Sequence, residues 1–291
     1  MLWLIAILSV MFLSPGFVHS GGSSVYYTDR VAVLAYHHID DDTTGDVTIS
    51  TDRFQGQLVD LGLRGYHFIT LEQFRSYMQG QAVPSNAVLV TFDDGYESFY
   101  TKAFPVLQRL HVPAVNFVIT HDLDHPGESL LPSLTPEEIR TMMAEDSDID
   151  VQCHSDSLHA KSAGGDPLLT ARLKNGDSLE TDDAYDQRIL ADTRTSIGKL
   201  SMLKTGPVDT YAYPYGAYDS RSVGLLKQAG MQYAFTTQPG IVDRNSDPMQ
   251  LPRINAGSPY VRMNSLNNTI MHKLQRSSSS TISTHTKRLA P

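Results

Sequence analysis

Two adjacent carboxylates follow an apolar run near the middle of the first half of the chain. Residues 86–96 read Asn-Ala-Val-Leu-Val-Thr-Phe-Asp-Asp-Gly-Tyr, and the run Ala87 to Val90 predicts a strand that is buried on both faces. Asp93 and Asp94 then lie where a parallel strand ends, the edge at which α/β folds build their sites. Because successive side chains of an extended chain point in opposite directions, one carboxylate can bind a metal ion while the other faces a water molecule. Gly95 permits a tight turn with positive φ, and the alternative interpretation is a solvent-exposed Asp-Asp-Gly turn.

A pair of histidines, His154 and His159, also has the chemistry of metal ligands. They are five residues apart in the segment His-Ser-Asp-Ser-Leu-His. On an α-helix this spacing would rotate one side chain by about 140° from the other, so the pair would not share a face. Both can reach one metal ion only if the segment is a loop that folds back from a strand end, which Ser155 and Asp156 allow. The alternative is a solvated loop, but a carboxylate offered by a neighbouring strand end favours the metal site.

Other polar residues appear just past the ends of further predicted strands, namely His37, Tyr215 and Arg253. In a parallel barrel, the carboxyl ends of all strands meet on one face. We therefore expect these side chains to converge with the carboxylates and histidines. This convergence is the main functional argument, and it depends on no single motif.

The elements that must position these residues alternate between strand and helix about seven times. Expected strands lie at 31–36, 66–69, 87–90, 114–119, 149–153, 211–213, 233–236 and 251–254, and expected helices at 52–63, 99–110, 183–204 and 222–229, with further helix starts at Thr70 and Thr135. Pro105 should kink or shorten its helix, Gly230 should end the last one, and residues 121–134 and 160–182 are expected to be loops. This alternation favours a parallel sheet with crossover helices, closed into a barrel or wound open.

Composition excludes several classes of function. The chain has 291 residues and a formal net charge of −9, with no block of lysine or arginine, which argues against nucleic acid as a partner. Cys153 is the single cysteine, so an intramolecular disulfide and a cysteine-rich zinc site are both impossible. A metal ion would therefore need histidine and carboxylate ligands.

The two ends of the chain differ from the rest. Residues 2–13 form an uncharged apolar run that is shorter than the roughly 20 residues of a transmembrane helix, and small residues follow it. We therefore expect a signal peptide over residues 1–22, although no lysine or arginine precedes the run and a retained membrane anchor remains an alternative. One domain is expected over residues 25–270, outside the cytoplasm, secreted or associated with the cell envelope. Residues 276–291 are rich in serine and threonine and should be a disordered tail.

Three motifs follow one another along the chain: Thr91-Phe92-Asp93-Asp94-Gly95, His154-Ser155-x-x-Leu158-His159 and Tyr213-Pro214-Tyr215-Gly216. In this order they resemble the central motifs of the polysaccharide deacetylases, the NodB-homology family of carbohydrate esterases. The histidine spacing of five and the early segment Ala35-Tyr36-His37-His38-Ile39 resemble the IcaB- and PgaB-like branch, which deacetylates poly-N-acetylglucosamine. The similarity spans roughly residues 30–255 and implies an α/β fold, a distorted (β/α) barrel with about seven parallel strands.

The resemblance implies a ligand set and a base. Asp94, His154 and His159 match the metal ligands, and Asp93 matches the general base that takes a proton from the metal-bound water. Zinc suits these ligands, while cobalt, nickel or manganese could occupy the same shell. Positions left open on the ion would accept the water and the acetyl oxygen.

The remaining roles are also carried over from the resemblance. The backbone N–H of Tyr215 matches the group that stabilises the tetrahedral oxyanion. His37 matches the general acid that protonates the leaving amine, with His38 as the alternative. Many family members have an arginine before the Pro-Tyr motif, but this chain has none there. Arg253 is our candidate to supply the positive charge beside the base, and a surface arginine is the alternative.

The expected function is therefore that of an exported, metal-dependent N-deacetylase acting on a β-linked N-acetylglucosamine polymer. Deacetylation of peptidoglycan, chitin oligomers or acetylated xylan is a second hypothesis with the same chemistry. A third, from a different class, is a catalytically inactive carbohydrate-binding domain. The intact set of acidic and histidine residues argues against this third hypothesis.

Overall fold

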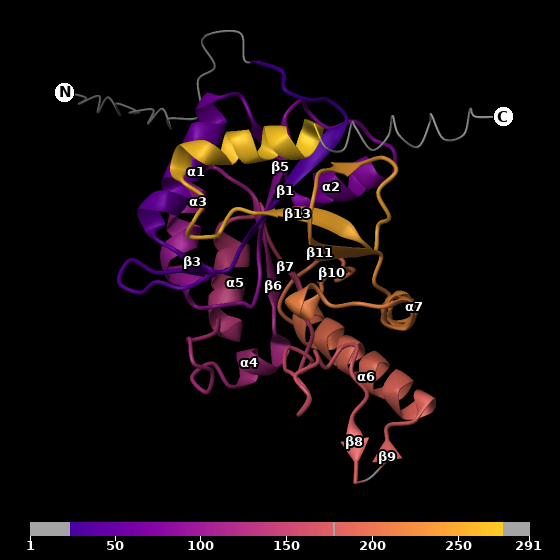
Figure 1. The fold of residues 1–291 in the computed structure, drawn as a ribbon. Coiled ribbons are helices and arrows are strands. Elements are labelled where there is room, and N and C mark those ends of the chain that lie inside the picture. Colours follow the sequence, from indigo (N-terminus) through magenta and orange to yellow (C-terminus); the bar gives the residue numbers. More distant parts are fainter. Residues whose placement is uncertain (1–23, 177, 276–291) are drawn as a thin grey trace, which may run out of the picture.

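The computed structural model describes residues 24–176 and 178–275 (Figure 1). The expected signal peptide and the expected disordered tail lie outside these residues, so both remain predictions. The described part includes a packed C-terminal helical segment over residues 266–275, whose Leu274 belongs to the main apolar cluster. Among the described residues, no helix has the length and apolar character needed to cross a membrane.

Seven parallel strands close into a barrel, which confirms the fold class expected from the sequence. Around the ring they are β1 (Arg30–Tyr36), β13 (Leu251–Asn255), β11 (Tyr233–Pro239), β10 (Thr210–Ala212), β7 (Ile149–Cys153), β6 (Ala114–Val118) and β5 (Ala87–Phe92). The ring closes where β5 pairs with β1 along their length, from Ala87 beside Val31 to Phe92 beside Tyr36. Two short strands extend the sheet, β4 (His67–Phe68) parallel to β5 and β12 (Val242–Asp243) antiparallel to β1.

The strands read as continuous apolar runs because both of their faces are buried. Along β1, Val31 and Val33 belong to one apolar cluster, which includes side chains of β5, β6, β10, β11 and β13 and of α2 (Leu71–Met78). Ala32 and Leu34 belong to a second cluster, in which the strands pack against the surrounding helices. Side-chain alternation thus divides each strand between the barrel interior and the helical layer.

The outer helices are α1 (Thr51–Leu63), α3 (Phe104–Leu110), α4 (Thr120–Asp124), α5 (Pro136–Glu145), α6 (Asp182–Ser201) and α7 (Ser220–Ala229). Capping boxes begin α2 at Thr70 and α5 at Thr135, and Gly230 ends α7 at φ 112°, as expected. The predicted helix over 99–110 is divided into a π-helical turn, Phe99–Ala103, and α3, because Pro105 occupies the first turn of α3.

Two segments predicted as loops contain short regular elements. Helix α4 begins one residue before the segment 121–134 and ends inside it, and a hairpin of β8 (Lys174–Asn175) and β9 (Ser178–Leu179) lies within 160–182. Figure 1 shows this hairpin projecting beyond α6. A further pair, β2 (His38–Ile39) and β3 (Thr48–Ile49), flanks the loop over residues 40–46. Such two-residue strands are too short to produce a periodic sequence signal.

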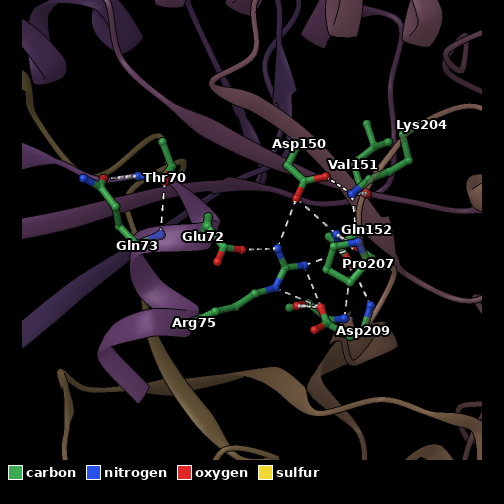
Figure 2. A network of polar contacts seen from close by, with 11 residues as sticks. Thr70, Glu72, Gln73, Arg75, Asp150, Val151, Gln152, Lys204, Pro207 and Asp209 are labelled. Atoms are coloured by element: carbon green, nitrogen blue, oxygen red, sulfur yellow. Dashed lines mark hydrogen bonds and ion pairs between the residues drawn. The ribbon is translucent and has the colours of Figure 1, made fainter. Parts of the chain in front are cut away.

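A buried ion-pair network closes the amino-terminal end of the barrel (Figure 2). Arg75 of α2 donates to Asp209, just before β10, at 2.6 Å and lies 3.7 Å from Asp150 of β7. Lys204 pairs with the same Asp150, and the amide of Gln152 accepts the backbone N–H of Asp209. Each buried cation thus has an acidic partner, and α2 is held across this end of the barrel. The candidate active site lies at the opposite, carboxyl-terminal end of the barrel.

Candidate active site

The polar residues at the strand ends converge on one pocket of about 230 Å³ at the carboxyl-terminal end of the barrel. Residues predicted from the sequence contribute from four of the strands. The pocket is lined by His37, Val47, Asp93, Asp94, His154, His159, Tyr213, Tyr215, Gly216 and Thr237. The parallel barrel therefore brings together side chains that are more than 170 residues apart in the chain.

Asp94, His154 and His159 form a compact ligand set. Oδ1 of Asp94 lies 3.2 Å from Nε2 of His154 and 3.3 Å from Nε2 of His159. One donor atom from each residue lies within 4.8 Å of the other two, and no other group of three or more such residues was found among the described residues. Asp94 and His154 are buried, whereas His159 is partly exposed at the pocket. The three could hold one cation.

Local backbone geometry directs these ligands. Asp94 follows β5 with φ 74°, in the left-handed region, and Gly95 follows with φ 73°. A Cβ on Gly95 would come within 2.9 Å of the Val118 side chain, so only glycine fits this turn. After β7, Ser155 has φ 104°, which turns the chain away from the strand direction. The segment between the two histidines is therefore a loop, as their spacing predicted.

Hydrogen bonding shows that this set suits a metal ion. Nδ1 of His154 lies 2.8 Å from the carbonyl oxygen of Ala212, which can only accept, so Nδ1 carries a proton. In the neutral imidazole, the lone pair of Nε2 then faces the carboxylate of Asp94. Two electron-rich atoms in contact need a proton or a metal cation between them, and one carboxylate with two imidazoles is a donor set that zinc accepts.

The protonation states agree with this interpretation. Burial opposes the charge of Asp94, but its hydrogen bond to His154 and the nearby histidines lower its pKa. Burial together with the neighbouring His154 lowers the pKa of His159 to about 4, which leaves its lone pair free at neutral pH. Burial opposes protonation of His154, yet Asp94 and Asp93 together raise its pKa. Metal binding would displace that proton.

Asp93 points to a different partner from Asp94, as expected for adjacent residues. Its two oxygens accept from Nη1 and Nη2 of Arg253 at 2.7 and 2.6 Å, and both side chains are almost fully buried. Arg253 also donates to the carbonyl of Thr236 and to the hydroxyl of Thr91. Burial raises the pKa of Asp93, but the charge and hydrogen bonds of Arg253 outweigh it and hold the pKa below its usual value. Asp93 is thus an ionised, rigidly oriented carboxylate.

The structure therefore places Arg253 beside the carboxylate rather than at the surface. It occupies the third position of β13, inside the strand rather than beyond its end. The ion pair of Arg253 and Asp93 connects β13 to the end of β5, and its two residues are 160 positions apart in the chain.

The two early histidines have different environments. Nε2 of His37 lies 3.8 Å from Oδ2 of Asp93, and its ring lines the pocket. His38 is buried, with Nδ1 3.3 Å from the hydroxyl of Thr48 and its ring against the ring of Tyr96. His37 and His38 point apart, so the geometry favours His37 over His38 as the residue that acts in the pocket.

Tyr215 forms part of the pocket wall. Its φ of 58° places it in the left-handed region, within the 3₁₀ turn Pro214–Gly216. Its ring stacks on the ring of His159 at a centroid distance of 4.5 Å, and the amino group of Lys161 lies 5.0 Å from the centroid of the same ring. The ring of Tyr215 thereby covers His159, one of the three candidate ligands.

Sequence reasoning did not identify every lining residue. Val47 comes from the loop before β3, and Thr237 from the part of β11 beyond the predicted strand end. Neither belongs to a motif, and neither has an ionisable side chain that could have pointed to it.

Comparisons with known proteins agree with this geometry. A family model described as polysaccharide deacetylase matches residues 80–234, more than half of the chain. The poly-β-1,6-N-acetyl-D-glucosamine N-deacetylase of Staphylococcus epidermidis is 28% identical over 207 residues, which cover 71% of this chain and 67% of that protein. A Staphylococcus aureus protein with the same description is 27% identical over the same length.

Solved structures show the same barrel. IcaB from Ammonifex degensii superposes with a TM-score of 0.68 at 27% identity, covering 78% of this chain and 91% of that one. A de-N-acetylase from Aggregatibacter actinomycetemcomitans has a TM-score of 0.73 at 24% identity and covers 83% and 100% of the two chains, a likeness of fold. Together with the family match, these findings show that the chain belongs to the polysaccharide deacetylase family.

Proposed function

We propose that this chain is an exported, metal-dependent N-deacetylase that removes acetyl groups from a β-linked N-acetylglucosamine polymer. The observation that carries the proposal is the single pocket in which Asp94, His154 and His159 face one another beside Asp93 and His37. The named activity of the staphylococcal relatives supports the choice of polymer. The expected signal peptide supports export.

In this proposal Asp94, His154 and His159 hold a divalent cation, and zinc is the ion that their donor atoms favour. When bound, such a cation polarises the acetyl carbonyl and makes water a stronger nucleophile. Cobalt, nickel and manganese accept the same donors, so metal identity is part of the test.

Asp93 serves as the general base. It takes one proton from the attacking water, whose oxygen forms a bond to the acetyl carbon. Arg253 keeps Asp93 ionised and fixes both of its oxygens, so the carboxylate does not need to reorient during the reaction. The backbone N–H of Tyr215 is the proposed donor to the oxyanion.

His37 serves as the general acid in the same pocket. It donates a proton to the amide nitrogen as the carbon–nitrogen bond breaks, which releases acetate and leaves a free amine on the sugar. The distance of 3.8 Å between Nε2 of His37 and Oδ2 of Asp93 supports assigning the acid and the base to the same pocket.

Acetate release from a panel of polymers tests the proposal. We expect release from poly-β-1,6-N-acetylglucosamine, loss of release after chelation, and recovery on addition of zinc. Faster release from peptidoglycan, chitin oligomers or acetylated xylan would change the assigned substrate. Sugar binding without turnover at any metal concentration would indicate a carbohydrate-binding domain and refute the enzyme.

A further inference from the structure

The loop between the two histidine ligands is held on both sides by other parts of the chain. The backbone N–H of Thr120, at the start of α4, donates to the carbonyl of Ser155 at 3.0 Å. On the other side lies α6, which supplies a carboxylate and an ammonium group to the same loop. Since His154 and His159 are the first and last residues of this segment, its conformation sets the distance between the two imidazoles.

Asp192 of α6 holds the main chain of this loop directly. Its Oδ1 accepts the backbone N–H of Asp156 at 3.0 Å, and its Oδ2 accepts that of Ser157 at 2.6 Å. Both oxygens are therefore used, one for each of two consecutive peptide groups. A charged acceptor makes such bonds stronger than a neutral one would.

Lys199 holds one side chain of the same loop, that of Asp156. It follows Asp192 by seven residues, which is about two helical turns, so the two side chains leave the same face of α6. Its Nζ lies 2.8 Å from Oδ1 of Asp156, and the Thr120 hydroxyl donates to that oxygen at 2.7 Å. Asp156, midway along the loop, is thus fixed through both its main chain and its side chain.

Asp192 is partly buried, and no Lys, Arg or His ion pair was found for it among the described residues. Burial raises its pKa to about 6 in spite of the two peptide hydrogen bonds, so its ionised form is disfavoured in the folded protein. The hydrogen bonds that this carboxylate accepts are those from the two peptide groups of the loop.

We propose that Asp192 is a positioning residue for the metal site, whose carboxylate holds the loop between His154 and His159 so that both Nε2 atoms face Asp94. This inference rests on the proposed metal-dependent function. Asp192 touches neither ligand, and it acts through the peptide groups of Asp156 and Ser157.

Two substitutions at Asp192 and one control test this role without substrate. Asp192→Ala removes both acceptors, whereas Asp192→Asn keeps one acceptor and places an amide donor against the second peptide N–H. Asp186→Asn is the matched control, because Asp186 lies on the same helix and pairs with Arg221 instead. The measurements are the zinc dissociation constant, by competition with a chelating dye, and hydrogen exchange of the loop amides in metal-free protein.

We expect Asp192→Ala to weaken zinc binding about tenfold or more, the range found when groups that orient metal ligands are removed. Asp192→Asn should lose less, and the amides of Asp156 and Ser157 should exchange faster in both variants. The control should match the wild-type protein in both measurements. If Asp192→Ala does not fold, the same comparison with Asp192→Asn decides the question.

The proposal is overturned if Asp192→Ala, or Asp192→Asn in its place, binds zinc within about twofold of wild type, whether or not the amides exchange faster. Equal loss in the Asp186→Asn control would also overturn it, because the effect would then come from α6 as a whole. A wild-type protein that binds no zinc would refute the proposed function as well, and this outcome is recognisable before any variant is made.

Discussion

Replacing Arg253 with methionine should lower both stability and activity, because no other lysine or arginine was found paired with Asp93 among the described residues. The exposed fractions of the two side chains are 2% and 3%, so water does not screen the pair. Removing one partner of a buried ion pair costs about 3–5 kcal/mol. The carboxylate would also take up a proton more readily, because burial then raises its pKa against the nearby histidines alone. A protonated Asp93 cannot act as the base.

The assay combines urea denaturation with acetate release at saturating zinc. We expect the free energy of unfolding of Arg253→Met to fall by about 3–5 kcal/mol and its kcat to fall by about 10²-fold or more. Arg64→Met is the matched control, since Arg64 pairs with Asp60 at 2.8 Å on the surface of α1. Such a surface pair is worth about 0.3–0.5 kcal/mol. A variant at Arg253 with control-like stability and near wild-type kcat would refute the reasoning.

Three further outcomes follow from the site. Asp93→Asn should keep zinc, measured by elemental analysis, and lose about 10²–10⁴-fold in kcat, because only the proton acceptor is removed. His154→Ala should lose zinc and turnover together, and retained stoichiometric zinc would contradict its assignment as a ligand. Because the pKa of Asp192 is raised to about 6, the folded protein takes up a proton there before the unfolded chain does. The free energy of unfolding of metal-free wild type relative to Asp192→Asn should therefore rise as pH is lowered from about 7 to about 5, and a difference independent of pH would refute this shift.

Residue order along the chain predicted the barrel because each strand carries its own signal. The run at 87–90 is apolar on both faces and ends at charged residues, which is the pattern of a parallel strand buried between two layers. Capping at Thr70 and Thr135 is likewise decided by residues three positions apart. Such local rules require no knowledge of the rest of the fold.

Long-range contacts were less accessible to sequence reasoning. Strand-end polarity predicted that Asp94, His154 and His159 would approach one another, and the structure places them together. Nothing in the sequence marked Asp192, because a single aspartate on a long helix is indistinguishable from a solvated one. Its contacts depend on how α6 packs against β7 and the loop that follows, and only the folded chain shows that arrangement.

The central claim is that Asp94, His154 and His159 bind one cation in the pocket that also contains Asp93 and His37. Anomalous diffraction at the zinc absorption edge, on crystals of the zinc-loaded protein, tests this claim most directly. Our account predicts one strong peak about 2 Å from a carboxylate oxygen of Asp94 and from Nε2 of each histidine. A zinc-loaded crystal with no peak there, or with its peak at other residues, would contradict the account.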